Sequence, residues 1–224
     1  MITPYADLLR QLRVERGFSQ SDMAEKLGLS RTSYTAIEQG KREITLSECE
    51  KLSLALGISI NDIERGETAD YEKYKEMILQ FLHFNSYLTK TKLAKLLYFA
   101  DFAWFYHNLK SMSGMEYRRI KYGPVADAYF RLIDEMNEAG EIAIEQLPEG
   151  AMHISETEAG AKHRLNRISK EEAALMKKIN EKWKGKRTAE VVSYTHKQLP
   201  YMFAEDNEIV SYEIFGQENP DEIY

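Results

Sequence analysis

The chain has 224 residues, a formal net charge of −6 and a pI of about 5.5. Hydrophobic residues make up 43% and charged residues 29%, a composition typical of a folded globular protein rather than a disordered one. The acidic balance argues against a protein that coats nucleic acid or a membrane surface without specificity, although it leaves room for a local DNA-reading surface.

The single cysteine and the N-terminal sequence narrow the class of protein further. Cys49 is the single cysteine, so an intramolecular disulfide and the Cys-x-x-Cys zinc motifs are excluded. The chain begins MITPYADLLR, without the apolar stretch of a secretory leader, so we expect a cytoplasmic protein with no membrane association.

Glycine stops and polar caps divide the first 66 residues into five predicted helices. Each predicted N-cap is a serine or threonine, the types whose side-chain oxygen accepts from the first helical turn, and Asp22 completes a capping box with Ser19. The helices are predicted at Pro4 to Arg16, Gln20 to Leu27, Arg31 to Gln39, Leu46 to Leu56 and Ile60 to Glu64, and Ser19, Ser30, Thr45 and Ser59 cap the last four.

The second and third helices are short and joined by Gly28-Leu29, which predicts a helix-turn-helix. The stretch that starts at Phe18, FSQSDMAEKLGLSRTSYTAIEQGKR, resembles the phage-repressor or xenobiotic-response-element (XRE) class of this motif. The resemblance covers Tyr5 to about Ile63 and implies a lambda-repressor-like five-helix DNA-binding domain, which we place at residues 1–66.

Docking geometry then predicts the DNA contacts. The second helix of such a motif enters the major groove with its N-terminal residues toward the base edges. Arg31 suits guanine O6 and N7, and the Thr32 methyl suits a thymine methyl. In full, the predicted base-facing residues are Arg31, Thr32, Thr35 and Ala36, and the predicted phosphate contacts are Gln20, Lys41 and Arg42.

The charge of residues 1–66 weakens the prediction that they bind DNA. Residues 1–66 hold nine Lys or Arg and ten Asp or Glu, so the basic footprint of a strong binder is missing, and a motif that binds only protein stays an alternative. Between residues 31 and 42 the balance is locally positive, with Glu38 the one acid, which we assign to the fold. A homodimer on two half-sites is the natural arrangement.

Residues 64–70 are polar and lack an apolar period, which makes them the predicted domain boundary. An amphipathic helix follows from Tyr71, and Thr89 is the predicted cap of the next one. That helix, Lys92 to Leu109, is apolar on every face but too short for a membrane span, so it is predicted to be the buried centre of a second domain. Asp101 within it needs a partner, and Arg118, Arg119, Lys121 or a tyrosine hydroxyl are all open.

The rest of the chain is predicted to be mostly helical with short strands. A strand at Tyr117 to Tyr122 leads to Gly123-Pro124, which starts a helix ending near Ala139. A β-hairpin follows around Pro148-Glu149-Gly150; its acidic character argues against a winged-helix DNA contact. Further predicted elements are a helix from Ser169 to Lys184, a helix capped by Thr188 and running through His196, and an acidic, partly loose end from Phe203 to Tyr224.

Three short motifs in this second part carry another resemblance. The run KLLYFAD begins at Lys95, SGMEY at Ser113 and KYGPV at Lys121, and the order and spacing resemble the Panacea antitoxin domain. The phrase from Ser193 to Pro200-Tyr201 resembles it too, although tryptophan is the usual residue after that proline. The resemblance covers roughly residues 70–224.

The Panacea resemblance implies a mainly α antitoxin that binds and neutralises a cognate protein toxin, while the helix-turn-helix domain represses its own promoter. The alternatives are a phage-type transcriptional repressor without a toxin partner, and a protease adaptor that delivers the toxin. The predicted toxin-contacting residues are Tyr117, Arg118, Arg119 and Tyr122, since tyrosine and arginine often anchor interfaces. No catalytic or metal motif occurs in the sequence, so we expect neither an enzyme nor a cofactor.

Overall fold

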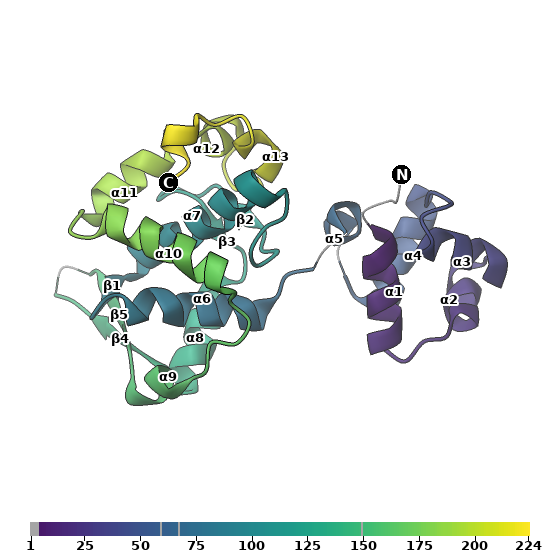
Figure 1. The fold of residues 1–224 in the computed structure, drawn as a ribbon, viewed down its shortest axis with the longest axis horizontal. Coiled ribbons are helices and arrows are strands. Elements are labelled where there is room, and N and C mark those ends of the chain that lie inside the picture. The colour runs from purple at the N-terminus through teal and green to yellow at the C-terminus, as the bar shows by residue number, and fades with distance from the viewer. Residues whose placement is uncertain (1–4, 59, 67, 149) are drawn as a thin grey trace. The chain divides into compact units, whose positions relative to one another are not determined.

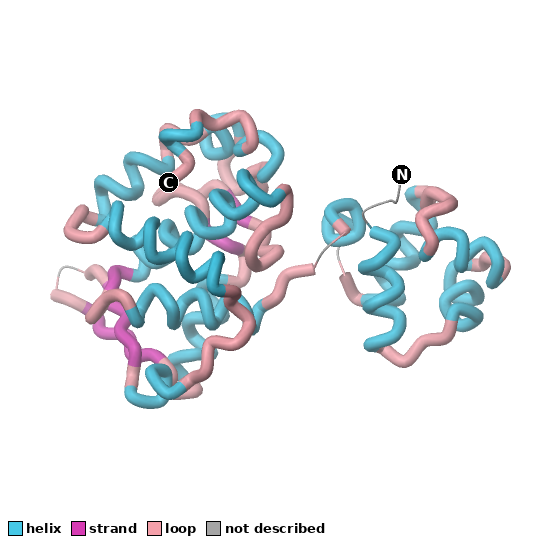
Figure 2. The backbone as a smooth tube through the Cα atoms, in the orientation of Figure 1, coloured by secondary structure: helices cyan, strands magenta, loops and turns pink. Residues whose placement is uncertain are grey.

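The computed structural model describes residues 5–58, 60–66, 68–148 and 150–224. The chain divides into two compact units, Met1–Ala69 and Asp70–Tyr224, each described by itself (Figure 1). Figure 2 shows that helices dominate both units and that short strands gather in the C-terminal one. The predicted cap Ser59 lies outside the described residues.

The N-terminal unit is helical, and its described helix ends lie within one residue of those predicted. Ser19 accepts from the Asp22 amide at 3.1 Å and the Asp22 carboxylate accepts from the Ser19 amide at 2.7 Å, which is the predicted capping box. Gly28 ends the second helix in the left-handed region with φ of 73°. The helices are α1 Tyr5–Glu15, α2 Gln20–Leu27, α3 Arg31–Glu38, α4 Leu46–Leu56 and α5 Ile60–Arg65.

One apolar core holds this unit together. It takes buried side chains from every helix, including Leu9, Met23, Ile37, Leu52 and Ile63, all with essentially no exposed surface. Since α2 and α3 both bury one face in this core, the opposite face of α3 is left at the surface.

The C-terminal unit is built around α7, Lys90–Asn108, which Thr89 caps as predicted. Every residue from 93 to 103 is buried, because α6 Tyr71–His83, α10 Lys170–Trp183, α11 Thr188–Thr195 and α13 Tyr212–Phe215 all pack on this helix. The helix is therefore the buried centre that its all-round apolar sequence predicts.

Two small antiparallel sheets complete the unit. The hairpin of β4 Ile142–Gln146 and β5 Met152–Glu156 is confirmed, and β1 Leu88–Thr89, which was not predicted, pairs with β5 to give the order β1-β5-β4. Ile154 lies opposite both Leu88 and Ile144, so apolar side chains line one face of this sheet.

The segment after Tyr117 corrects the sequence prediction. Only Tyr117–Arg118 forms a strand, β2, and it pairs with β3 at Val125–Ala126, where a helix was predicted. Helix α8 starts at Tyr129 and ends at Glu138, because pairing with β2 keeps residues 125 and 126 extended. Proline at residue 124 therefore belongs to the turn between the strands and does not open the helix.

The C-terminal stretch was predicted to be partly loose, and this is wrong for the described structure. The Val210 amide donates to the Tyr117 carbonyl at 2.8 Å and the Arg119 amide donates to the Glu208 carbonyl at 2.9 Å, so this segment lies along β2. Tyr212 and Phe215 are buried against α7. The remaining short elements are α9 Glu158–Lys162, α12 Leu199–Phe203 and the 3-10 turn Pro220–Glu222. One further correction is that Arg187, not Thr188, is the N-cap of α11.

Candidate functional site

The exposed face of α3 brings most of the predicted DNA contacts together. Ser30 caps α3 through the Ser33 amide at 3.1 Å, which presents Arg31 and Thr32 at the exposed N-terminal end of this helix. A shallow surface hollow is lined by Gln20, Arg31, Thr32, Thr35, Ala36, Gln39 and Lys41. Six of the seven predicted residues thus share one surface.

Gln39 is the residue that sequence reasoning missed at this surface. It follows α3 directly, is exposed, and accepts a hydrogen bond from Lys41 Nζ at 2.8 Å. Its spacing of three and four residues from Ala36 and Thr35 places it on their face of the helix, so periodicity alone was enough to include it.

Arg42 is the predicted phosphate contact that does not line the hollow. Its guanidinium makes a bidentate pair with Glu48, at 3.0 and 2.7 Å. That pairing lowers the pKa of Glu48 to about 2, so the carboxylate is charged at neutral pH. Arg42 is therefore engaged within the protein, at the start of α4.

Glu38 serves the fold, as expected. It is buried, and its carboxylate accepts from Arg13 at 2.5 and 3.2 Å and from Gln20 at 3.0 Å. Burial alone raises its pKa, but the Arg13 and Gln20 hydrogen bonds outweigh it and lower the pKa overall. Because Gln20 also accepts from the Thr35 hydroxyl at 3.2 Å, this network fixes two residues of the hollow.

In the C-terminal unit, the buried Asp101 carboxylate organises the segment after α7. It accepts from the Ser113 amide at 2.7 Å, from the Ser113 hydroxyl at 2.5 Å and from the Tyr117 hydroxyl at 2.7 Å. Of the partners left open, a tyrosine hydroxyl, that of Tyr117, is present. Tyr117 is 0% exposed, so its prediction as an exposed toxin contact is wrong, because its ring and hydroxyl complete the core.

The two arginines of this segment have different roles. Arg119, the residue after β2, donates to the carbonyls of Tyr201 at 3.2 Å and Ala204 at 2.5 Å and stacks on the Tyr201 ring, so it connects the end of β2 to α12. Arg118 pairs with Asp127 at 2.8 Å, where both side chains are more than a third exposed. Of the two arginines predicted to contact the toxin, Arg118 is thus the more exposed.

Tyr122 lies beyond β2 and is 57% exposed, as predicted. Within the described ranges, no three His, Cys, Asp or Glu side chains lie close enough together to hold a metal ion. None of the helices in those ranges is long and apolar enough to cross a lipid bilayer.

Comparison with known proteins now separates the two units by family. Residues 9–63 match the helix-turn-helix family, and residues 93–200 match the family described as antitoxin SocA-like, Panacea domain. The chain belongs to the helix-turn-helix regulators and carries a SocA-like Panacea domain. It is thus a DNA-binding transcriptional regulator with a SocA-like antitoxin domain, and neither family is known for enzymes.

Individual relatives support the regulator assignment. The control protein C.MunI of a Mycoplasma species is 38% identical over 60 residues, covering 26% of this chain and 81% of the relative. The cryptic phage CTXphi transcriptional repressor RstR of Vibrio cholerae is 33% identical over 75 residues, covering 33% of this chain and 68% of the relative. The SPbeta prophage-derived regulator YonR of Bacillus subtilis is 35% identical over 68 residues, with 30% and 63% covered. No solved structure gives a significant match.

Proposed function

We propose that the protein is an antitoxin that represses its own promoter through residues 1–66 and neutralises a cognate protein toxin through residues 70–224. The observation that carries the DNA half is the gathering of Arg31, Thr32, Thr35 and Lys41 around one exposed hollow on α3. An exposed α3 whose N-terminus presents an arginine matches the docking of a recognition helix in the major groove.

Within this proposal, Arg31 reads guanine O6 and N7, and Thr32 contacts a thymine methyl. Gln20 is held by Glu38 and Thr35 at 3.0 and 3.2 Å, so its amide is pre-oriented toward a backbone phosphate. Lys41 supplies charge at the same rim. Because the unit lacks a basic surplus, a single copy binds weakly and a homodimer on two half-sites supplies the affinity.

The test is a binding titration on the protein's own promoter DNA. Arg31→Ala is expected to weaken operator binding by about 1–3 kcal/mol and to relax one base position, since it removes a bidentate base contact. Lys41→Ala is expected to weaken all sequences about equally and to reduce the salt slope by about one. Arg10→Ala is the matched control, because this exposed arginine on α1 does not line the hollow. Wild-type affinity in both test variants contradicts the DNA half.

The toxin half rests on the Panacea match and on the exposed side chains beside β2. Arg118 and Tyr122 are the contacts we propose, since both are exposed and neither is needed in the core. In cells carrying the toxic reading frame beside this gene, Arg118→Ala should fold normally and lose rescue from the toxin. Arg31→Ala should do the reverse, with promoter repression lost and rescue kept. If Arg31→Ala loses rescue while Arg118→Ala keeps it, the division between the two units is reversed.

Two other outcomes lead to other functions. The relatedness to a phage repressor favours a transcriptional repressor without a toxin partner, and in that case no neighbouring reading frame is toxic. If rescue occurs but disappears in a strain that lacks the degrading protease, the protein is an adaptor that delivers the toxin.

A further inference from the structure

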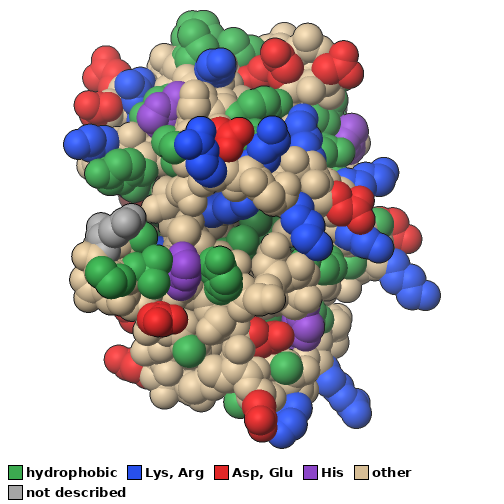
Figure 3. All heavy atoms as spheres, turned by 90° about the vertical axis from the view of Figure 1, so that its left-hand side faces the viewer, with side chains coloured by type: hydrophobic (Ala, Val, Ile, Leu, Met, Phe, Trp, Pro, Cys, Tyr) green, Lys and Arg blue, Asp and Glu red, His purple; other side chains and the backbone are tan. Residues whose placement is uncertain are grey.

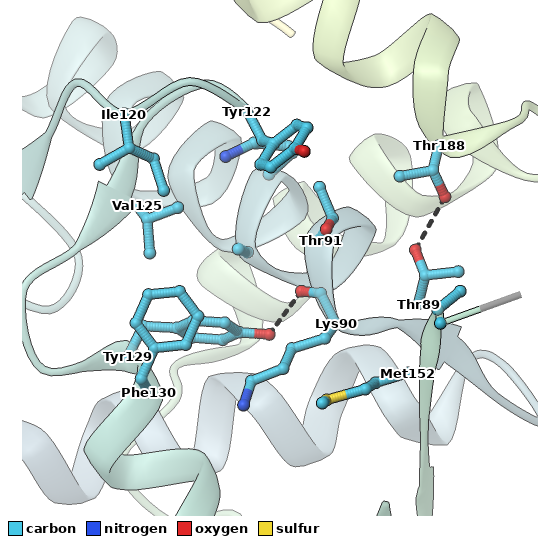
Figure 4. Close-up of a pocket in the computed structure, with 14 residues that line it drawn as sticks. Thr89, Lys90, Thr91, Ile120, Tyr122, Val125, Tyr129, Phe130, Met152 and Thr188 are labelled. Atoms are coloured by element: carbon cyan, nitrogen blue, oxygen red, sulfur yellow. Dashed lines mark hydrogen bonds between the residues drawn. The ribbon is translucent and has the colours of Figure 1, made fainter. Parts of the chain in front are cut away.

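A pocket of about 350 Å³ lies in the C-terminal unit, at the N-terminal end of the central helix α7. Figure 4 shows its walls: the N-cap Thr89, the first turn of α7 with Lys90 and Thr91, the turn before β3, the start of α8, the hairpin and the start of α11. The Tyr129 hydroxyl donates to the Lys90 carbonyl at 2.7 Å, and the Thr89 and Thr188 hydroxyls are 2.7 Å apart. These bonds join separate elements, so the pocket is preformed.

The walls are mainly apolar. The apolar part of the lining consists of aromatic and aliphatic side chains from the turn, α8 and the hairpin: Ile120, Tyr122, Val125, Tyr129, Phe130 and Met152. Volume and lining are those of a small-molecule site, in which an apolar body is enclosed and a few polar groups fix its orientation.

The charged side chains among the described lining residues of the pocket are all basic. Among its described lining residues are two lysines, Lys90 and Lys95, and no aspartate or glutamate, in a chain whose net charge is −6. Lys90 Nζ lies 5.2 Å from the Phe130 ring centroid and 3.9 Å from Asp134, which is exposed outside the pocket. The first-turn amides of a 19-residue helix add a partial positive charge at the same place.

Lys95 is the decisive group. Its side chain has 0% exposure, and its Nζ donates to the Pro124 carbonyl at 2.7 Å. An ammonium has three N–H donors, and no carboxylate of the described residues forms an ion pair with this one. Because a charged lysine without a counter-charge is unfavourable, burial lowers the pKa of Lys95 to about 7, and a bound anion stabilises the protonated form.

We propose that this pocket binds a small organic anion that has an apolar body and a single terminal carboxylate. The carboxylate lies at the pocket wall nearest to the buried Lys95 and at the first turn of α7, and the apolar body lies against Val125, Tyr129 and Phe130. One negative charge matches the protonated form of the one buried lysine, and a pocket of about 350 Å³ accommodates a free small molecule. Figure 3 shows the side of the molecule carrying the hairpin and α11, where basic and hydrophobic side chains border each other. The pocket shares Tyr122 with the proposed toxin contacts, but the ligand proposal does not depend on the operator-binding or toxin-binding proposal.

The experiment compares octanoate with octanamide, which has nearly the same shape and no charge. Calorimetric titration of the full chain at pH 7 is expected to show octanoate binding at least about tenfold more tightly than octanamide. Lys95→Met keeps the length and apolar character of the side chain and removes its charge, so it should bring octanoate down to the level of octanamide. Lys90→Met should weaken octanoate by a smaller factor, since Lys90 lies at the rim.

A second variant keeps the test valid if Lys95→Met folds poorly. Ala151 is an exposed lining residue of the hairpin, and Ala151→Trp is expected to fill the pocket and abolish binding of both probes without a change in melting temperature. The proposal is overturned if octanoate does not bind below about 10 mM, if both probes bind equally, or if folded Lys95→Met or Ala151→Trp binds octanoate as the wild type does.

Discussion

Tyr117→Phe removes one oxygen atom from the core and isolates the role of the buried Asp101 carboxylate. The Tyr117 hydroxyl donates to Asp101 at 2.7 Å, and its ring packs at 5.6 Å from Tyr98 and 5.5 Å from Phe102. Phenylalanine keeps both ring contacts. Burial raises the pKa of Tyr117 well above 10, so the hydroxyl is a donor throughout the neutral range.

The magnitude follows from the charge of the acceptor. A hydrogen bond to a charged group contributes about 1.5–3 kcal/mol, and here its loss leaves a buried carboxylate with one donor fewer. For a unit of this size we expect the melting temperature to fall by about 3–12 °C. Tyr212→Phe breaks a bond of 2.8 Å to the neutral Met115 carbonyl, so its loss should be smaller, about 0.5–1.5 kcal/mol.

Urea unfolding of the full chain, followed by circular dichroism, measures these differences. The exposed Tyr122→Phe is the control and should stay within about 0.5 kcal/mol of the wild type. A double-mutant cycle with Asp101→Asn then isolates the coupling between the hydroxyl and the carboxylate. If Tyr117→Phe is no more destabilising than Tyr122→Phe, Asp101 does not organise this segment.

Three further substitutions test other parts of the C-terminal unit. Arg119→Ala should lower the free energy of unfolding by about 2–3 kcal/mol because it removes two part-buried hydrogen bonds from a charged donor. Arg118→Ala should stay within about 1 kcal/mol, since its ion pair with Asp127 and its hydrogen bond to the Asn207 carbonyl are both exposed. Equal losses of stability in thermal melts contradict these roles. Gly123→Ala should lower the free energy of unfolding by about 2 kcal/mol or more, because φ at this residue is 89° and an added Cβ would lie 2.6 Å from the Thr195 hydroxyl oxygen. Gly140→Ala should lower it by only about 1 kcal/mol, because φ is 72° but an added Cβ would meet open space. Equal losses of stability in urea unfolding refute the packing argument. Burial lowers the pKa of Lys95 to about 7, so between pH 7 and 10 the unfolded chain binds more protons than the folded chain. The free energy of unfolding should therefore rise with pH, relative to that of Lys95→Met, by up to about 1.4 kcal/mol per pH unit. Parallel curves of stability against pH for the two proteins contradict this.

The sequence by itself determined the helices that have clear caps and a clear period. Ser19, Ser30 and Thr45 mark the N-terminal helices because a side-chain oxygen one residue before a helix is a local signal. It also determined the buried role of α7, and the face of α3 that presents Arg31, since one helix turn fixes which residues share a face.

Tertiary structure decided everything that depends on partners distant in the sequence. Val125 belongs to a strand because it pairs with Arg118, and the C-terminal segment is ordered because it lies along β2. The residues around Val125 and in the C-terminal segment contain no local pattern that predicts these pairings.

The same limit applied to the candidate sites. Tyrosine and arginine at residues 117 to 119 suggested an exposed interface, but Asp101 draws Tyr117 into the core and α12 holds Arg119. Nothing in the sequence indicated a pocket at Lys95, because the pocket forms only where α7, the turn before β3 and α8 come together. Periodicity fixes which residues share a face, and only the packing of distant elements decides what that face meets.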